Sequence, residues 1–140
     1  MTRISEVMTR DVHIADPNQT IREAARAMAE ANIGGLPVGE NDRLIGMITD
    51  RDIVMRAVAT GKADNTKVRD VMTGRIRYCF DDDDINRVAE NMASLGVHRL
   101  PVVNHDKRLV GIISRSNLAR QAGNGKSAGK SSRHAARAKH

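Results

Sequence analysis

The sequence is poor in cysteine and aromatic residues, and it has no long apolar run. Cys79 is the only cysteine, so no disulfide can form within the chain. Tyr78 and Phe80 are the only aromatic residues, too few to build the stacking platform that binds single-stranded nucleic acid. The longest apolar runs have about five residues, as in Leu109 to Ile113, whereas a membrane-spanning helix needs about 20.

The amino terminus also lacks an apolar stretch fit for a secretion signal, so we expect a cytoplasmic protein. Cys79 stands between the two aromatic residues in a run typical of a strand, and we expect it to be packed rather than reactive. With 140 residues, 40% of them apolar, the chain is long enough for one ordinary domain or for two small halves that share a core.

Positive charge is concentrated near the carboxyl terminus. The formal net charge is +6, but five of the 23 lysines and arginines lie between Ala122 and His140, where no acidic residue occurs. The other 18 nearly balance the 17 acidic residues. The same segment has no large apolar side chain and cannot offset the entropy cost of ordering. We therefore predict a disordered basic tail over residues 122–140.

The rest of the chain is a repeat with a period of 64 residues. The triplet "VMT" at Val7 returns at Val71, and "LPV" at Leu36 returns at Leu100. After one inserted residue the offset becomes 65, and the insertion falls among polar turn residues, where a hairpin loop tolerates a change of length. The sequence thus predicts two repeats, residues 4–64 and 65–121, followed by the tail.

Each repeat predicts the order strand, helix, strand, strand, helix. A short strand, around residues 12–15 or 76–80, precedes a polar turn and an amphipathic helix. Two apolar runs then predict a strand hairpin, and a second helix closes the repeat. Neither repeat can cover both faces of its small sheet. We therefore predict an α/β fold in which two pseudo-symmetric β-α-β-β-α repeats pack sheet to sheet.

No residues have the spacing of a metal site or a catalytic site. The four aspartates Asp81–Asp84 correspond to an ordinary turn and helix start in the first repeat, and capping and the helix dipole favour aspartate there. The five histidines show no ligand-type spacing, and no Ser/His/Asp pattern or glycine-rich phosphate loop occurs. We predict no enzyme activity, no metal and no catalytic cofactor.

A hydroxyl and a carboxylate, Thr49 and Asp52, stand three residues apart where a predicted strand runs into a helix. For this pair alone, a capping box is the simpler interpretation. A binding role gains support because Ser114 and Asn117 keep the same polar types and spacing in the second repeat. Ligands of α/β proteins also tend to bind at strand ends. A carboxylate or amide oxygen there suits the hydroxyl donors of a ribose.

Together these motifs resemble a tandem pair of CBS domains, the Bateman module. The resemblance covers Ile4 to about Gln121 and rests on the "VMT" starts, on "GGLPV" and "HRLPVV", and on "GMITDRDI" and "GIISRSNL". It implies a non-enzymatic regulatory module that binds AMP, ADP, ATP, NAD or S-adenosylmethionine in clefts between the repeats, as an energy or metabolite sensor. It also implies a homodimer through the helices and an unidentified downstream protein.

By position, the resemblance places the two polar pairs against the ribose, His98 and Arg99 against the phosphate, and apolar strand residues against the adenine. The first repeat has glycines in place of His98 and Arg99, with Arg51 as partial compensation. We therefore expect the second repeat's pair to serve the stronger site for a phosphate-bearing ligand. The residues implied are Val12, Leu36, Thr49, Arg51, Asp52, Ile76, His98, Arg99, Leu100, Ser114, Arg115 and Asn117.

Two other functions stay open. The basic tail could hold nucleic acid or an acidic partner, with a salt slope of about four to five units if all five cations met duplex phosphates. A solvated terminus is the simpler interpretation of that tail. Alternatively, the module could have lost its ligand and serve as a scaffold or as a subunit of an enzyme encoded elsewhere. The two polar pairs argue against that loss.

Overall fold

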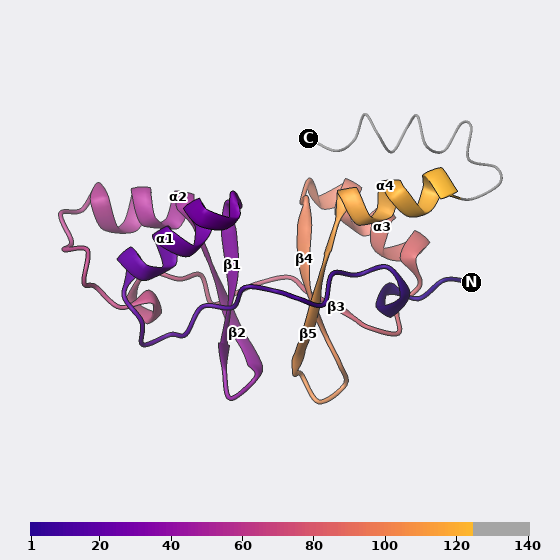
Figure 1. Ribbon diagram of the computed structural model, residues 1–140, viewed down its shortest axis with the longest axis horizontal. Helices are drawn as coiled ribbons and strands as arrows, with labels where there is room; N and C mark the ends of the chain where they lie inside the picture. The colour runs from indigo at the N-terminus through magenta and orange to yellow at the C-terminus, as the bar shows by residue number, and fades with distance from the viewer. Residues whose placement is uncertain (125–140) are drawn as a thin grey trace. The chain divides into compact units, whose positions relative to one another are not determined.

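The computed structural model describes residues 1–124, which form two compact units (Figure 1). The continuous unit is one stretch of chain, His13–Ile76. The split unit combines Met1–Val12 with the chain from Arg77 onward. Each unit holds the helices and the strand hairpin of one sequence repeat, so the predicted α/β class is confirmed.

The continuous unit contains one antiparallel hairpin with helical segments before and after it. Its elements are α1 (Ile21–Ala31), β1 (Gly35–Glu40), β2 (Arg43–Thr49), α2 (Asp50–Asp52), the π-helical turn η2 (Ile53–Val58) and the 3-10 turn η3 (Val68–Asp70). In the hairpin, Gly35 lies opposite Thr49. Thr20 begins α1 with a capping box, because its hydroxyl accepts from the N–H of Glu23 and the Glu23 carboxylate accepts from the N–H of Thr20.

The split unit repeats this order and has one more short strand. Its elements are the 3-10 turn η1 (Ile4–Glu6), β3 (Cys79–Phe80), α3 (Ile85–Leu95), β4 (Arg99–Val103), β5 (Leu109–Ser114) and α4 (Arg115–Asn124). In its sheet, β3 is parallel to β4, and β4 is antiparallel to β5. Arg99 lies opposite Ser114, as Gly35 lies opposite Thr49 in the other unit.

Each unit has its own apolar core, formed where the apolar face of its first long helix meets its hairpin. In the continuous unit, Ile21 and Met28 of α1 belong to one buried cluster with Ile48 of β2. In the split unit, Met92 of α3 and Ile113 of β5 are buried in a second cluster. The predicted apolar faces of the two helices therefore face these cores, except that Leu95, predicted on the apolar face of α3, is 46% exposed at the end of the helix.

The "VMT" segment of each repeat packs on the hairpin of the other repeat. In the split unit, Thr9 and Ile112 exchange backbone hydrogen bonds of 2.8 and 2.9 Å. In the continuous unit, Thr73 and Met47 exchange bonds of 2.8 and 3.0 Å. The "VMT" segment that begins the first repeat thus pairs with the second strand of the second repeat's hairpin, and the segment that begins the second repeat pairs with the second strand of the first repeat's hairpin. The compact units and the sequence repeats consequently have different boundaries.

The first strand of each repeat is shorter than predicted. Around residues 12–15, the pairing is a single bridge between Ala15 and Val38. The chain already turns at Asp16, whose carboxylate accepts from the N–H of Asn18 at 2.7 Å. In the second repeat only Cys79–Phe80 pairs, because the Asp83 carboxylate turns the chain by accepting from the N–H of Phe80 at 2.9 Å.

The end of α4 reaches Asn124, so helix occupies the first three positions of the predicted tail. The rest of that predicted tail, residues 125–140, lies outside the described residues. Within the described chain, no helix combines the length and the apolar character needed to cross a membrane. Cys79 is buried in β3, and this burial, helped by the nearby Asp83 and Asp81, raises the pKa of its thiol to about 12.

Candidate ligand-binding site

Thr49 and Asp52 form a capping box at the end of β2. The Thr49 hydroxyl accepts from the N–H of Asp52 at 3.0 Å, and the Asp52 carboxylate accepts from the N–H of Thr49 at 3.0 Å. Thr49 itself is extended, so the strand passes directly into α2. The capping role predicted for this pair is therefore present in the structure.

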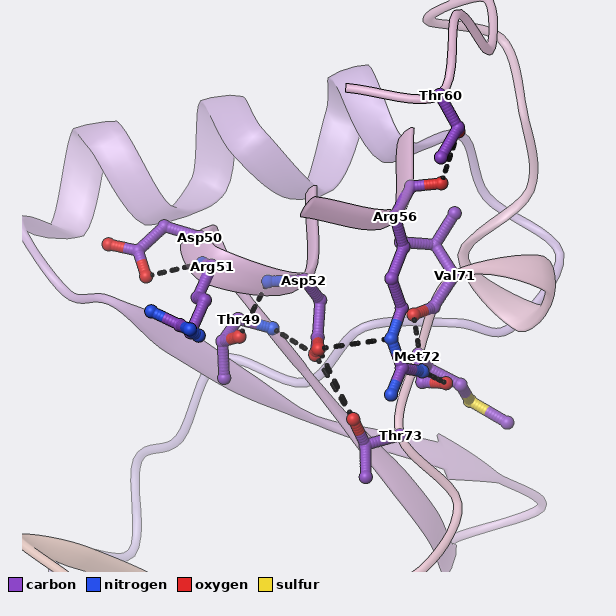
Figure 2. Close-up of polar contacts among 9 residues, drawn as sticks. All are labelled: Thr49, Asp50, Arg51, Asp52, Arg56, Thr60, Val71, Met72 and Thr73. Carbon is purple, nitrogen blue, oxygen red and sulfur yellow. Dashed lines mark hydrogen bonds and ion pairs between the residues drawn. The ribbon is translucent and has the colours of Figure 1, made fainter. Parts of the chain in front are cut away.

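The Asp52 carboxylate has two further neighbours, which come from beyond its own turn (Figure 2). The hydroxyl of Thr73 lies 3.2 Å from one carboxylate oxygen and 3.4 Å from the other. The guanidinium of Arg56 lies 3.8 Å away, one helical turn along the chain. The Asp52 side chain is 13% exposed, so its charge is held largely inside the protein. The Thr73 contact could not be predicted from the sequence, because 21 residues separate the partners.

Arg56 joins Asp52 to the "VMT" segment of the second repeat. Its guanidinium donates to the carbonyl oxygens of Met72 at 3.1 Å and Val71 at 3.4 Å. Figure 2 shows the Arg56 side chain between Asp52 and these carbonyls. A cation placed between a carboxylate and backbone oxygens fixes both, because hydrogen bonds to a charged group are the stronger kind.

Ser114 and Asn117 make the equivalent turn at the end of β5, but they bond differently. The Asn117 side-chain oxygen accepts from both the N–H and the hydroxyl of Ser114, each at 2.8 Å. The Ser114 hydroxyl accepts from the N–H of Asn117 at 3.2 Å. The Asn117 side-chain nitrogen donates to the hydroxyl of Thr9 at 3.4 Å. Asn117 is 5% exposed, and it is the only buried polar residue among those described.

The predicted phosphate contacts lie next to the Ser114 turn. Arg99 faces Ser114 across the hairpin, and the N–H of Arg115 donates to the carbonyl of His98 at 3.0 Å. The side chains of His98 and Arg99 are exposed. In the continuous unit, Gly34 accepts from the N–H of Asp50 at 3.0 Å in the same way. The hairpin thus brings His98, Arg99 and Arg115 to the strand end at which Ser114 lies.

The remaining predicted ligand contacts are less accessible or lie apart from the polar pairs. Leu36 and Leu100 are buried in the two cores, and this burial does not favour contact with an adenine ring. Their contact with the ligand stays a prediction. Val12 and Ile76 are partly exposed and end the segments that lead out of each unit. Arg51 is exposed beside the capping box.

A groove of about 460 Å³, which was not predicted from the sequence, lies beside the helices of the continuous unit. Its walls come from α1, from the turn after it, and from the start of α2 and η2. Gly34 lies in this lining, and a Cβ atom added to it would stand 3.3 Å from the Asp50 carboxylate, which is a tight contact. The lining residues are Ala25, Met28, Ala29, Asn32, Ile33, Gly34, Asp50, Ile53 and Val54.

Three of the four consecutive aspartates, Asp82, Asp83 and Asp84, have side-chain hydrogen-bond partners. Asp84 begins α3, and its carboxylate accepts from the N–H of Asn86 at 3.4 Å. Asp82 forms an exposed ion pair of 2.9 Å with His105, whose ring stacks on Phe80 with 4.7 Å between ring centres. This hydrogen bond raises the pKa of His105 and lowers the pKa of Asp82. Ligand atoms of Asp81, Asp82 and His105 lie within 4.8 Å of one another, and the ion pair already joins two of them.

Comparison with protein families gives two matches to the CBS domain, over residues 4–59 and 68–123. Among curated proteins, the chain is 37% identical over 129 residues to the CBS domain-containing protein YhcV of Bacillus subtilis. That match covers 92% of this chain and 91% of the relative.

Two similar solved structures contain adenosine ligands. The CBS domain pair of protein MJ0100, in complex with 5′-methylthioadenosine and S-adenosyl-L-methionine, matches with a TM-score of 0.74 and 28% identity. That match covers 88% of this chain and 97% of the other. The structure of CBSX2 in complex with AMP matches with a TM-score of 0.76 and 26% identity, over 87% of this chain and 96% of the other.

Proposed function

Because this chain belongs to the CBS-domain family, we propose that it is a non-enzymatic regulatory module that binds an adenine nucleotide. The supporting observation is that both repeats match CBS domains, and that similar CBS pairs have been solved with AMP or with S-adenosylmethionine. The proposed ligands are AMP, ADP, ATP, NAD or S-adenosylmethionine. Their common part is adenosine.

The polar groups at the strand ends have the chemistry that adenosine requires. The ribose carries two adjacent hydroxyl donors, and Asp52 is a carboxylate acceptor at the end of β2. His98 and Arg99 add exposed donors beside the Ser114 turn, where a 5′-phosphate would find a cationic partner. Binding would stabilise the folded state and bias its conformation, which is how a ligand acts as a signal without being chemically changed.

Isothermal titration calorimetry of the full chain with AMP, ADP, ATP, NAD, S-adenosylmethionine and adenosine tests this proposal. We expect at least one ligand to bind, and thermal unfolding to shift upward with its concentration. At about a hundred times the dissociation constant, the stabilisation is about 2.7 kcal/mol. Inosine monophosphate is the control for adenine recognition. Absence of binding by all six ligands would refute the proposal.

We further propose a homodimer through the helical face of the continuous unit. Val54, Met55 and Val58 on η2 are 54%, 53% and 67% exposed, and Val54 also lines the groove beside α1. The corresponding positions of the second repeat hold Ala119, Arg120 and Gly123, so the fold does not itself require large apolar side chains there. Apolar protrusions beside a groove on one face suit self-association about a twofold axis.

Sedimentation velocity tests the homodimer. We expect Val54→Arg to shift the protein to monomer, because it places a charge in the buried part of the interface. Ala119→Arg changes the corresponding helix of the second repeat and is the matched control, expected to leave the dimer intact. A monomeric wild-type protein would overturn this part of the proposal.

A further inference from the structure

In the split unit, the turn between β3 and α3 meets the loop of the β4–β5 hairpin at a group of side chains that can ligate a metal. We propose that Asp81, Asp82 and His105 bind one divalent transition-metal ion such as Zn²⁺. The inference goes beyond the proposed function and does not rest on it, because it concerns an inorganic ligand and residues that nucleotide binding does not use.

The three side chains are close enough to share one ion. One ligand atom from each lies within 4.8 Å of the other two, and Nε2 of His105 is 2.9 Å from a carboxylate oxygen of Asp82. Donors about 2.1 Å from a tetrahedral ion stand about 3.4 Å apart. The ion therefore fits when the His105–Asp82 contact lengthens slightly and the Asp81 carboxylate rotates inward. His105 and Asp82 have the freedom for this, since their side chains are 66% and 51% exposed.

Two of the four consecutive aspartates shape the chain, and the other two belong to the proposed site. Asp83 accepts from a backbone N–H in the turn, and Asp84 does so at the start of α3. Within residues 1–124, the carboxylate of Asp81 makes no hydrogen bond and no ion pair. Asp82 contacts His105, which is 23 residues away along the chain. Turn formation and helix capping therefore do not account for Asp81 and Asp82.

The backbone and the ring that carry the donors are held in place. The N–H of Asp81 donates to the carbonyl of Val103 at 3.0 Å, and the Asp81 carbonyl accepts from the N–H of Ser5 at 2.9 Å. The His105 ring stacks on Phe80, with 6° between the ring planes and 4.7 Å between the ring centres. An ion then has to order only side-chain torsions, which lowers the entropy cost of binding.

The donors belong to the second repeat alone. In the first repeat, Pro17 and Asn18 stand at the positions that correspond to Asp81 and Asp82. The hairpin loop that carries His105 is one residue longer than the loop of the first repeat, which contains no histidine. The first repeat thus forms the same turn and the same hairpin without these donors, so the fold does not require them.

The donor set favours a transition metal over Mg²⁺ or Ca²⁺. Imidazole nitrogen suits Zn²⁺, Cu²⁺ and Ni²⁺, whereas Mg²⁺ and Ca²⁺ prefer oxygen ligands throughout. The two carboxylates balance the charge of a divalent ion. The ion takes the place of the proton between Nε2 of His105 and the Asp82 carboxylate, and this proton leaves to solvent. The spacing in the sequence did not predict the site, because the histidine lies on a different element from the aspartates.

Calorimetry of the full chain with ZnCl₂, after metal has been removed with a chelator, tests the site. We expect Zn²⁺ to bind, and to bind about tenfold or more weakly in Asp81→Asn and in His105→Phe. His105→Phe removes the donor nitrogen but keeps a ring on Phe80. Asp106→Asn, in the same exposed loop, and His13→Gln are the matched controls and should bind like the wild type. Absence of binding by the wild type, or unchanged affinity in His105→Phe, would overturn the site.

Proton NMR of the histidine rings shows where the ion binds. We expect the ring signals of His105 to respond first as Zn²⁺ is added. The double variant His134→Gln/His140→Gln removes the two histidines that lie outside the described residues, and it should keep this response. A response that begins at another histidine, or that disappears in the double variant, would place the ion elsewhere and refute the inference.

Thermal unfolding supplies a third test. Zn²⁺ should raise the unfolding temperature of the wild type more than that of His105→Phe, because the ion ties the turn before α3 to the hairpin loop only in the folded chain. Mg²⁺ at the same concentration should show no such difference. Equal stabilisation by Mg²⁺ would mean a general effect of charge on the acidic turn, and the site would be wrong. The same experiment without metal shows whether each variant is folded.

The proposed function and this inference can fail separately. Nucleotide binding measured with a chelator present tests the proposed function alone. Zinc binding measured without nucleotide tests the metal site alone.

Discussion

The carbonyl oxygen of Thr73 lies 2.7 Å from the place where a Cβ atom of Gly46 would stand. The sulfur of Met72 is 3.0 Å from the same point. Gly111 has the same relationship to the other "VMT" segment, at 2.8 Å from the Thr9 carbonyl. The backbone of each "VMT" segment can pair with its strand only because the strand has no side chain at this position.

Gly46→Ala should therefore destabilise the protein by about 1–3 kcal/mol, because the added methyl group overlaps backbone that cannot move without losing the Met47–Thr73 pairing. Chemical denaturation measures the change. Gly74→Ala is the control, since nothing lies within 4 Å of its Cβ position. Equal effects of the two substitutions would contradict the close packing.

Ile4→Ala should cost about 2–5 kcal/mol of unfolding free energy, because Ile4 is fully buried in the core of the split unit. Ile14→Ala is the matched control, because that side chain is 49% exposed. Hydrogen exchange should place the loss in the split unit, far along the sequence from the substitution, at the amides of α3 and β5. Loss confined to residues near the amino terminus would argue against the split unit.

The Asp82–His105 ion pair should make a pH-dependent contribution to stability. The hydrogen bond raises the pKa of His105 above its ordinary 6.5. The stabilisation that comes from the protonated His105 ring is therefore fully present below pH 6.5 and is lost as the pH rises through the pKa of the folded state. The pKa of Asp82 is lowered from its ordinary 3.8, so its stabilisation is present above that value and is lost as the pH falls through the folded pKa.

Proton NMR titration of the His105 ring measures this directly. We expect a midpoint above 6.5 in the wild type, moving down in Asp82→Asn. The exposed site makes the change in stability small. A midpoint that does not respond to Asp82→Asn would show that the pair is not formed in solution.

Cys79 should react slowly with thiol reagents in the native protein. Burial raises its pKa to about 12, so at neutral pH almost none of the sulfur is the reactive thiolate. Reaction with a chromogenic disulfide reagent should become fast when the protein is unfolded in denaturant. Fast native labelling would mean that the β3 edge opens readily.

Periodicity and capping chemistry were enough to predict the local elements from the sequence. The apolar spacing of α1 and α3 identified the faces that are buried, and the insertion between the repeats fell in a hairpin loop. The Thr49–Asp52 spacing likewise predicted a capping box. These features depend on residues within a few positions of one another, which a single sequence records directly.

The long-range contacts could not be predicted in this way. A repeat shows that Val7 corresponds to Val71, but it does not show which hairpin each "VMT" segment joins. The Thr73–Asp52 and Asn117–Thr9 contacts depend on that exchange. The close approach of the Asp50 carboxylate to Gly34 could not be predicted either, because the sequence does not show which atoms surround a glycine.

The exchanged "VMT" segments have a consequence for any attempt to divide this protein. A gene cut after Ile76 would encode one fragment that contains the whole continuous unit. The same fragment would also carry Met1–Val12, which belongs to the split unit. The other fragment would lack Met1–Val12 and, with that segment, the buried side chains of Ile4 and Met8. The two units therefore differ as modules. The continuous unit can be expressed as one stretch of chain, whereas the split unit requires Met1–Val12 to be joined to Arg77 by an artificial linker.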